Sequence, residues 1–228
     1  MGLQDIAVFV FDLDDTLYPE KQFVESGLHA VSAYLQASGM TAADLFPQLW
    51  QKFSGGRQGT IFNEALSDAG IAYDAGIINK LVQVYRSHTP EIHLYPDALF
   101  LLQHLQGRKK IGLLSDGYAE TQKNKVTALG AEVYFDSIVF TDALGREFWK
   151  PHPAGFNKIM GRFSAAGHEC LYVGDNPEKD FYGARKLGWK TIQVKRTDGI
   201  YNGRESLSDE HRADSMVQSL YEIAVRIE

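Results

Sequence analysis

The sequence feature that most restricts the fold is an alternation of short apolar runs with helical patterns from about Lys110 onward. Strands are predicted at residues 111–114, 137–140, 170–173 and 191–194, and helices at residues 98–105, 119–129, 154–163, 179–187 and 215–227. Strands that alternate with helices form a parallel sheet wrapped by helices. We therefore expect an α/β fold, to which the apolar residues 8–11 add a further strand.

The segment between this first strand and the alternating region has only helical patterns. Apolar residues recur at three- and four-residue intervals from Phe23 until Gly39, a typical helix end. Further helices are predicted at residues 41–53, 61–69 and 75–85. We therefore expect an all-helical insert at residues 18–93, within a core made of residues 1–17 and 94–228.

Charge and composition argue against several classes of protein. The 228-residue chain has a formal net charge of -6, and its basic residues are dispersed, whereas a nucleic-acid-binding face needs clustered cations. The apolar run at residues 6–11 is too short for a signal peptide, and no run has the length of a membrane span. A single cysteine, Cys170, excludes an intramolecular disulfide. We expect a soluble cytoplasmic protein without nucleic-acid or membrane partners.

Carboxylates follow the first predicted strand directly, at Asp12 and Asp14, with Thr16 after them. The carboxyl ends of strands in open α/β sheets are where ligands bind. Neighbouring acids repel one another unless a cation neutralises them, which favours a hard metal such as Mg²⁺. The alternative is a polar turn, in which Asp15 or Thr16 caps the next helix.

Polar residues also follow the later strands of the predicted sheet. Ser115, Asp116 and Gly117 could receive an anion through a hydroxyl and backbone N–H groups, although Ser-Asp-Gly is also a common turn. Lys150 precedes a helix start, where the helix dipole favours anions, so it either binds a shared anion or is simply solvated. After residues 170–173, Asp175, Asn176 and Asp180 bring a second acidic cluster to the same sheet edge.

Together the four motifs D-L-D-D-T, L-S-D-G, K-P and G-D-N-P-E-K-D resemble those of the haloacid dehalogenase-like superfamily, in the same order. The helical insert resembles the C1-type cap domain of its subfamily I. The resemblance implies a Rossmann-like, doubly wound parallel sheet with an inserted all-helical cap. It also implies a Mg²⁺-dependent phosphatase that acts on a small phosphate monoester.

The resemblance gives each motif residue a role. Asp12 would be the nucleophile that forms an aspartyl-phosphate, and Asp14 the general acid and base. Ser115 and Lys150 would grip the phosphoryl oxygens, with Asp116 and Gly117 beside them. Mg²⁺ would be held by Asp12, by Asp175 and by the backbone carbonyl of Asp14, while Asp180, Asn176 and Thr16 support the site. Because a halide leaving group needs no proton, the presence of Asp14 favours a phosphatase over a dehalogenase.

Substrate selection is expected in the cap, and the candidate contacts in the cap or at the rim of the site are Tyr18, Arg57, Arg86 and His88. Arg57 lies in a glycine-rich loop at residues 54–59, which is either a plain connection or a means of bringing a cation to an anionic ligand. A phosphotransferase or phosphomutase of the same superfamily is the alternative enzyme, and a non-catalytic metabolite-binding protein is a further alternative. The sequence does not select one phosphorylated metabolite, does not distinguish a monomer from a small homo-oligomer, and assigns no role to the polar loop at residues 195–212.

Overall fold

The computed structural model describes residues 2–57, 59–200 and 202–227. The chain folds into two compact units, which we call the core unit (Met1–Glu20 and Ile92–Glu228) and the helical unit (Lys21–Glu91). The helical unit is shorter at both ends than the insert predicted at residues 18–93, and Tyr18 therefore belongs to the core unit.

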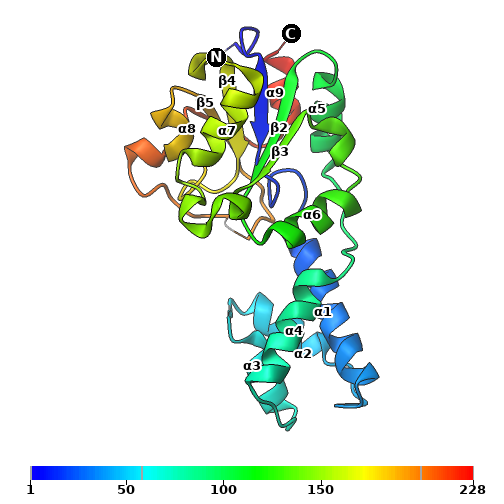
Figure 1. Ribbon diagram of the computed structural model, residues 1–228. Helices are drawn as coiled ribbons and strands as arrows, with labels where there is room; N and C mark the ends of the chain where they lie inside the picture. Colours follow the sequence, from blue (N-terminus) through cyan, green and yellow to red (C-terminus); the bar gives the residue numbers. More distant parts are fainter. Residues whose placement is uncertain (1, 58, 201, 228) are drawn as a thin grey trace. The chain divides into compact units, whose positions relative to one another are not determined.

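The core unit is built on a six-stranded sheet in which every neighbouring pair of strands is parallel (Figure 1). Its strand order is β3-β2-β1-β4-β5-β6. The strands are β1 (Val8–Phe11), β2 (Lys110–Ser115), β3 (Ser137–Phe140), β4 (Cys170–Gly174), β5 (Lys190–Val194) and β6 (Ser215–Val217). This order is that of a doubly wound Rossmann-like sheet, so the predicted fold class is confirmed.

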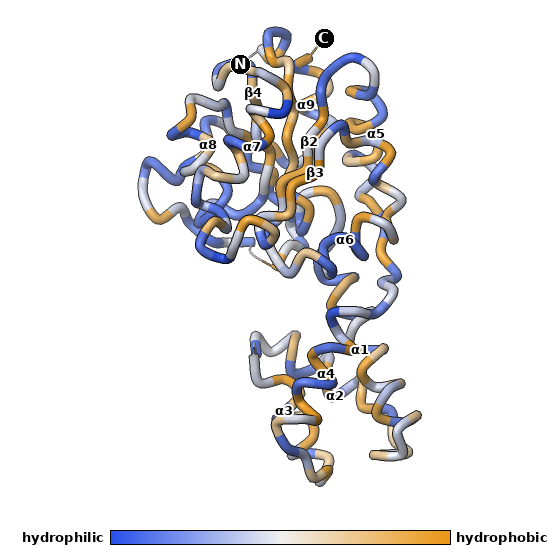
Figure 2. The backbone as a smooth tube through the Cα atoms, in the orientation of Figure 1, coloured by the Kyte–Doolittle hydropathy of each residue, from blue (hydrophilic) through white to orange (hydrophobic). Residues whose placement is uncertain are grey.

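Helices cover both faces of this sheet. They are α5 (Pro96–Leu105), α6 (Ala119–Ala128), α7 (Ala154–Phe163), α8 (Tyr182–Lys186) and α9 (Tyr221–Val225). Val8 and Val10 point to the face where Phe156 and Ile159 of α7 pack. Phe9 and Phe11 point to the opposite face of the sheet, because side chains alternate along a strand. On that face α5 contacts both β2 and α9. Figure 2 shows the apolar strands at the centre of the core unit, whereas α6 is mostly polar.

Short 3-10 helices lie in the connections of the core unit. Their bounds are Glu132–Tyr134, Thr141–Leu144, Arg146–Phe148, Gly167–Glu169 and Asp209–His211. None of the helices in the described ranges is both long and apolar enough to cross a membrane.

The helical unit contains the helices α1 (Glu20–Ala37), whose first residue belongs to the core unit, α2 (Phe46–Ser54), α3 (Ile61–Asp68) and α4 (Ala75–Ser87). The prediction of a helix over residues 41–53 was wrong in its start. The carboxylate of Asp44 accepts hydrogen bonds from the Ser32 hydroxyl at 2.7 Å and from the Phe46 amide at 3.0 Å, which fixes a turn before the helix. Pro47 suits the first turn of α2, where its missing N–H has no partner to lose.

A single helix over residues 215–227 was also predicted wrongly, because this segment forms strand β6 and the short helix α9. The chain turns between them at Ser219 and Leu220, whose hydroxyl and amide donate to Asp97 Oδ2 at 2.7 and 2.8 Å. Asp97 also pairs with the Arg196 guanidinium, at 2.7 Å. A buried ion pair outside the segment therefore interrupts the helix that its apolar spacing indicated.

Candidate active site

Asp12 lies at the point where the strand order of the sheet reverses. Asp12 directly follows β1, and its backbone amide donates to the carbonyl of Val173 in β4 at 2.9 Å, so the neighbouring strand holds it in place. The chain runs from β1 to β2 on one side and later returns to β4 on the other, which leaves a crevice at the carboxyl ends of these two strands. Only 2% of Asp12 is exposed.

Lys150 reaches this crevice from the loop before α7. Its Nζ lies 2.5 Å from Asp12 Oδ1, 2.8 Å from Asp180 Oδ1 and 2.9 Å from the hydroxyl of Tyr172. The Lys150 side chain has no exposed surface, which rules out the alternative of a solvated lysine. Burial disfavours the charged ammonium, but Asp12 and Asp180 outweigh burial and raise the pKa of Lys150 well above its ordinary value.

Asp12, Asp175 and Asp180 form an acidic cluster in which one oxygen of each carboxylate lies within 4.8 Å of the others. Burial, assisted by Asp180, raises the pKa of Asp12 to about 6, although Lys150 opposes it. Burial is also the main cause that raises the pKa of Asp175 well above its usual range. Asp12 Oδ2 is buried and has no hydrogen-bond partner among the described residues. Three carboxylates that each bring one oxygen so close to the others fit a hard divalent cation such as Mg²⁺.

A tight turn after β4 holds Asp180 in this cluster. Asp180 Oδ2 accepts the Asn176 amide at 2.8 Å, and Asn176 Oδ1 accepts the Glu178 amide at 3.0 Å. These bonds delay the helix predicted from residue 179, which begins at Tyr182 instead. Gly174 is required here, because a Cβ at this position would lie 2.4 Å from Asp180 Oδ2.

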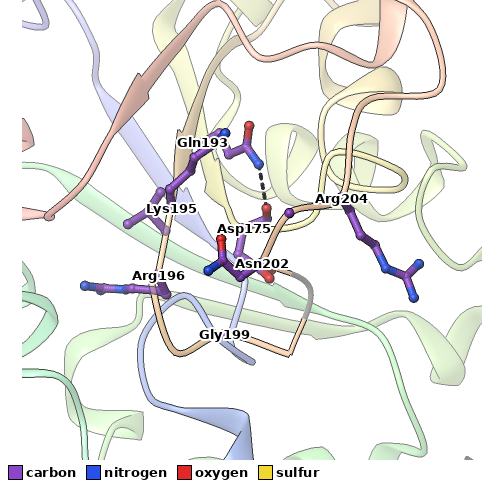
Figure 3. Close-up of a pocket in the computed structure, with 9 residues that line it drawn as sticks. Asp175, Gln193, Lys195, Arg196, Gly199, Asn202 and Arg204 are labelled. Carbon is purple, nitrogen blue, oxygen red and sulfur yellow. Dashed lines mark hydrogen bonds between the residues drawn. The ribbon is translucent and has the colours of Figure 1, made fainter. Parts of the chain in front are cut away.

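A small pocket lies beside Asp175, between the end of β5 and the loop that follows it (Figure 3). Gln193 Nε2 donates to the backbone carbonyl of Asp175 at 2.9 Å, and Lys195, Asn202 and Arg204 line the same pocket. Its volume of about 10 Å³ suits a single water molecule rather than a phosphate ester. Part of the loop that had no predicted role thus packs next to the backbone of a candidate metal ligand.

Ser115 is the last residue of β2 and Asp116 follows it, and the two side chains differ in their surroundings. Ser115 is buried, and its hydroxyl lies in the network around Asp14 described below. Asp116 Oδ1 accepts from the Thr141 hydroxyl at 2.6 Å and from the Lys150 amide at 3.1 Å. The Asp116 carboxylate therefore joins the loops after β2 and β3. Gly117 has a φ of +111°, a conformation that favours glycine.

The carboxylate of Asp14 points toward α6, away from the acidic cluster that holds Asp12. Its Oδ1 accepts from Lys125 Nζ at 2.6 Å and from the Tyr18 hydroxyl at 2.5 Å, and its Oδ2 accepts from Gln122 Nε2 at 2.9 Å. Burial opposes ionisation, but these donors, led by Lys125, outweigh burial and lower the pKa of Asp14. The proposed contact of the Asp14 carbonyl with a metal stays a prediction.

Sequence reasoning did not identify Gln122 and Lys125 as site residues. Their spacing of three puts both on one face of α6, and both are buried although they are polar. No pattern in the sequence marks them, because a polar helix face usually faces solvent. Tyr18, expected as a cap or rim contact, is a buried residue of the core unit, and its contact with a substrate stays a prediction.

The remaining predicted residues lie as follows. Thr16 is buried, its carbonyl accepts from Arg196 at 2.8 Å, and its hydroxyl has no partner among the described residues. Asp15 Oδ1 accepts the backbone amide of Glu20, the first residue of α1, at 2.8 Å, although Asp15 lies five residues before the helix and is not its N-cap residue. Arg57 lies in the helical unit, exposed, with its Nε 3.8 Å from Glu64.

The other two cap candidates also lie in the helical unit. His88 Nδ1 is 2.6 Å from the carbonyl of Tyr85, and Arg86 is in the last turn of α4.

Comparison with known proteins shows the family to which the chain belongs. A model of the haloacid dehalogenase-like hydrolases matches residues 9–194. A glyceraldehyde 3-phosphate phosphatase of Methanopyrus kandleri is 29% identical over 218 residues, which cover 92% of this chain and 91% of that protein. The residues that the family model matches include all four motifs and the segment between the first two.

Two solved structures share the fold. A HAD hydrolase from Bacillus subtilis bound to magnesium has a TM-score of 0.71 and 20% identity, with 98% of this chain and 99% of that chain covered. A 2-haloacid dehalogenase from Pseudomonas syringae has a TM-score of 0.64 and 23% identity, with 97% and 98% covered. At these identities the similarity establishes the fold and not the reaction.

Proposed function

Because this chain belongs to the haloacid dehalogenase-like hydrolase family, we propose that it is a phosphatase that hydrolyses a small phosphate monoester with the aid of Mg²⁺. The phosphatase relative from Methanopyrus kandleri supports a small phosphorylated substrate. The observation that carries the proposal is the unpaired, buried Oδ2 of Asp12 beside a buried lysine. A carboxylate oxygen in that position is available to react, since Lys150 holds the other oxygen in place.

The first half of the reaction is the attack of Asp12 on phosphorus. A bond forms between the Asp12 carboxylate oxygen and phosphorus, and the bond from phosphorus to the ester oxygen breaks. Asp14 gives a proton to the departing oxygen. In the second half, water attacks phosphorus, the bond to Asp12 breaks, and Asp14 takes the proton from the water.

Charge neutralisation is the other requirement, since the substrate is an anion and the crevice is acidic. Lys150 and Ser115 would contact the phosphoryl oxygens. Asp12, Asp175 and Asp180 are the residues that would hold Mg²⁺, which supplies positive charge to the phosphoryl group when it is bound. Asp14 favours phosphate esters over haloacids, because an alkoxide leaving group needs a proton and a halide does not.

We also propose that the helical unit is a C1-type cap that selects the substrate. Arg57 is the candidate contact for an anionic group, because it is an exposed guanidinium in a glycine-rich loop. On this proposal, Arg57→Ala raises the KM of the best substrate several-fold, and Arg108→Ala, an exposed arginine of the core unit, does not. An unchanged KM for Arg57→Ala would remove Arg57 from the site.

The test is phosphate release from a panel of small phosphate monoesters, with Mg²⁺ or with EDTA. We expect activity only with Mg²⁺, none for Asp12→Asn, and full activity for Asp209→Asn, which changes an exposed aspartate far along the chain. In thermal melts, Mg²⁺ should raise the Tm of the wild type and not that of Asp175→Asn. A folded, Mg²⁺-binding protein that hydrolyses no ester would contradict the proposal, and transfer to an added alcohol instead of water would indicate a phosphotransferase.

A further inference from the structure

We propose that Gln122 and Lys125 of α6 are positioning residues that orient the catalytic groups Asp14 and Ser115. This inference rests on the proposed phosphatase function and assigns a task to a helix that carries none of the four motifs. Only 2% of Gln122 and 4% of Lys125 are exposed, so both side chains act inside the site and not on its surface.

Gln122 joins two catalytic groups through one nitrogen. Its Nε2 lies 2.6 Å from Ser115 Oγ and 2.9 Å from Asp14 Oδ2. An amide nitrogen has two hydrogens, so it can donate to both acceptors at once. The amide oxygen could not take its place, because it would then face a carboxylate oxygen.

The hydrogen bond from Gln122 determines what the Ser115 hydroxyl can do. Because Ser115 Oγ accepts from Gln122, its own hydrogen must point elsewhere. The acceptor that the structure offers, the carbonyl of Asp116, is 3.4 Å away, which is a weak hydrogen bond. Ser115 is therefore oriented to donate its hydrogen to a phosphoryl oxygen, and Gln122 is what orients it.

Lys125 fixes the second catalytic group. Its Nζ lies 2.6 Å from Asp14 Oδ1, and the Lys125 side chain is 5% exposed. With Gln122 on Oδ2 and Lys125 on Oδ1, both oxygens of the Asp14 carboxylate are held by α6. The rotation of Asp14 relative to the leaving oxygen thus depends on the position of this helix.

The two residues should have separable effects. Lys125 contacts Asp14, so its loss should impair proton transfer to the leaving group. Gln122 contacts Ser115 as well, so its loss should also weaken the binding of the phosphoryl group itself. A purely structural role would lower all rates together.

The experiment measures kcat/KM for two esters, 4-nitrophenyl phosphate and glycerol 2-phosphate, and the inhibition constant of inorganic phosphate. An aryl leaving group departs without a proton, whereas an alkyl leaving group needs one. We expect Lys125→Met to lower kcat/KM for the alkyl ester about 100-fold, in line with general acid catalysis, and for the aryl ester much less. Inhibition by phosphate should stay within about twofold, since no phosphate contact is lost.

Gln122→Glu keeps the shape of the side chain but replaces its donor with an acceptor. We expect phosphate to inhibit this variant about tenfold more weakly, the usual effect of one lost hydrogen bond to an anion. Lys125→Arg should restore most of the alkyl rate, because it retains a charged donor. Lys123→Met, an exposed lysine on the same helix, is the matched control and should behave as the wild type.

Equal losses on both esters for Lys125→Met, with unchanged phosphate inhibition of Gln122→Glu, would overturn the inference. If Lys125→Met does not fold, Gln122→Glu decides alone, and wild-type phosphate inhibition in that variant refutes the positioning role. A wild type that is inactive on every ester would instead refute the proposed function.

Discussion

Lys150→Met is expected to destabilise the protein strongly, because it removes a buried ammonium that contacts both Asp12 and Asp180. Methionine has a similar length and volume, so the packing changes little. At an effective dielectric constant near 20, charges separated by the observed 2.5 and 2.8 Å attract by about 6 kcal/mol each. Much of that attraction offsets the loss of hydration, and the removal of one partner from a buried pair costs about 3–5 kcal/mol.

We therefore expect the free energy of unfolding to fall by about 3–5 kcal/mol, a large part of the roughly 5–15 kcal/mol typical of a folded protein. Urea unfolding followed by circular dichroism measures this change directly. Lys186→Met is the control: it removes an exposed pair with Glu210, in which the side chains are 50% and 63% exposed, and it should leave the urea midpoint of unfolding unchanged.

A second substitution, at a partner of Lys150, tests the same ion pairs. Asp180→Asn in the Lys150→Met background removes one of the carboxylates left without a cation, so the double variant should lose about 1–3 kcal/mol less than the two single losses combined. If the free energy of unfolding of Lys150→Met lies within about 1 kcal/mol of that of the wild type, Lys150 does not balance the charge of the two acids. The same conclusion holds if the losses of the two single variants simply add.

Two further predictions concern stability and activity. Asp97→Asn should cost about 3 kcal/mol at pH 7, because Arg196 is left buried without its partner. Burial opposes ionisation of Asp97, but Arg196, Ser219 and the Leu220 amide hold its pKa below the usual value. The ionised carboxylate therefore stabilises the fold above pH about 3.9, and this stabilisation is lost as the pH falls further. In urea melts below that pH, the difference in free energy of unfolding between variant and wild type should close. Gly174→Ala should displace Asp180 and lower phosphate release about 100-fold, whereas Gly161→Ala, whose Cβ would meet nothing within 4 Å, should add about 0.5–1 kcal/mol and leave activity unchanged.

The sequence predicted strands β1, β2, β4 and β5 well because almost every residue in them is buried, whereas the partly exposed β6 was missed. A buried parallel strand is a nearly continuous apolar run, and each such run here lies between polar segments. The positions of Asp12 and Asp175 followed from the same rule, since the parallel strands that precede them end at one edge of the sheet. The pattern of apolar and polar residues was therefore sufficient to predict these strands and the residues that directly follow them.

Contacts between segments that are far apart in the sequence could not be predicted from the residue types within one segment. The burial of Lys150 depends on Asp180 and Tyr172, and nothing in the K-P motif distinguishes a buried lysine from a solvated one. The helix expected over residues 215–227 failed for a similar reason, because Asp97 captures the Ser219 hydroxyl and the Leu220 amide. Gln122 and Lys125 were missed because a polar helix face usually faces solvent.

The central place of β1 has a consequence for synthesis of the chain. Val8 pairs with Lys110 on one side and with Cys170 on the other, and Lys150 lies 138 residues after the Asp12 that it contacts. The apolar β1 therefore leaves the ribosome long before its β4 partner, and one edge of it has no strand to pair with during that time. A nascent chain of this protein should need protection from aggregation until β4 emerges, and its catalytic crevice forms only in the last part of translation.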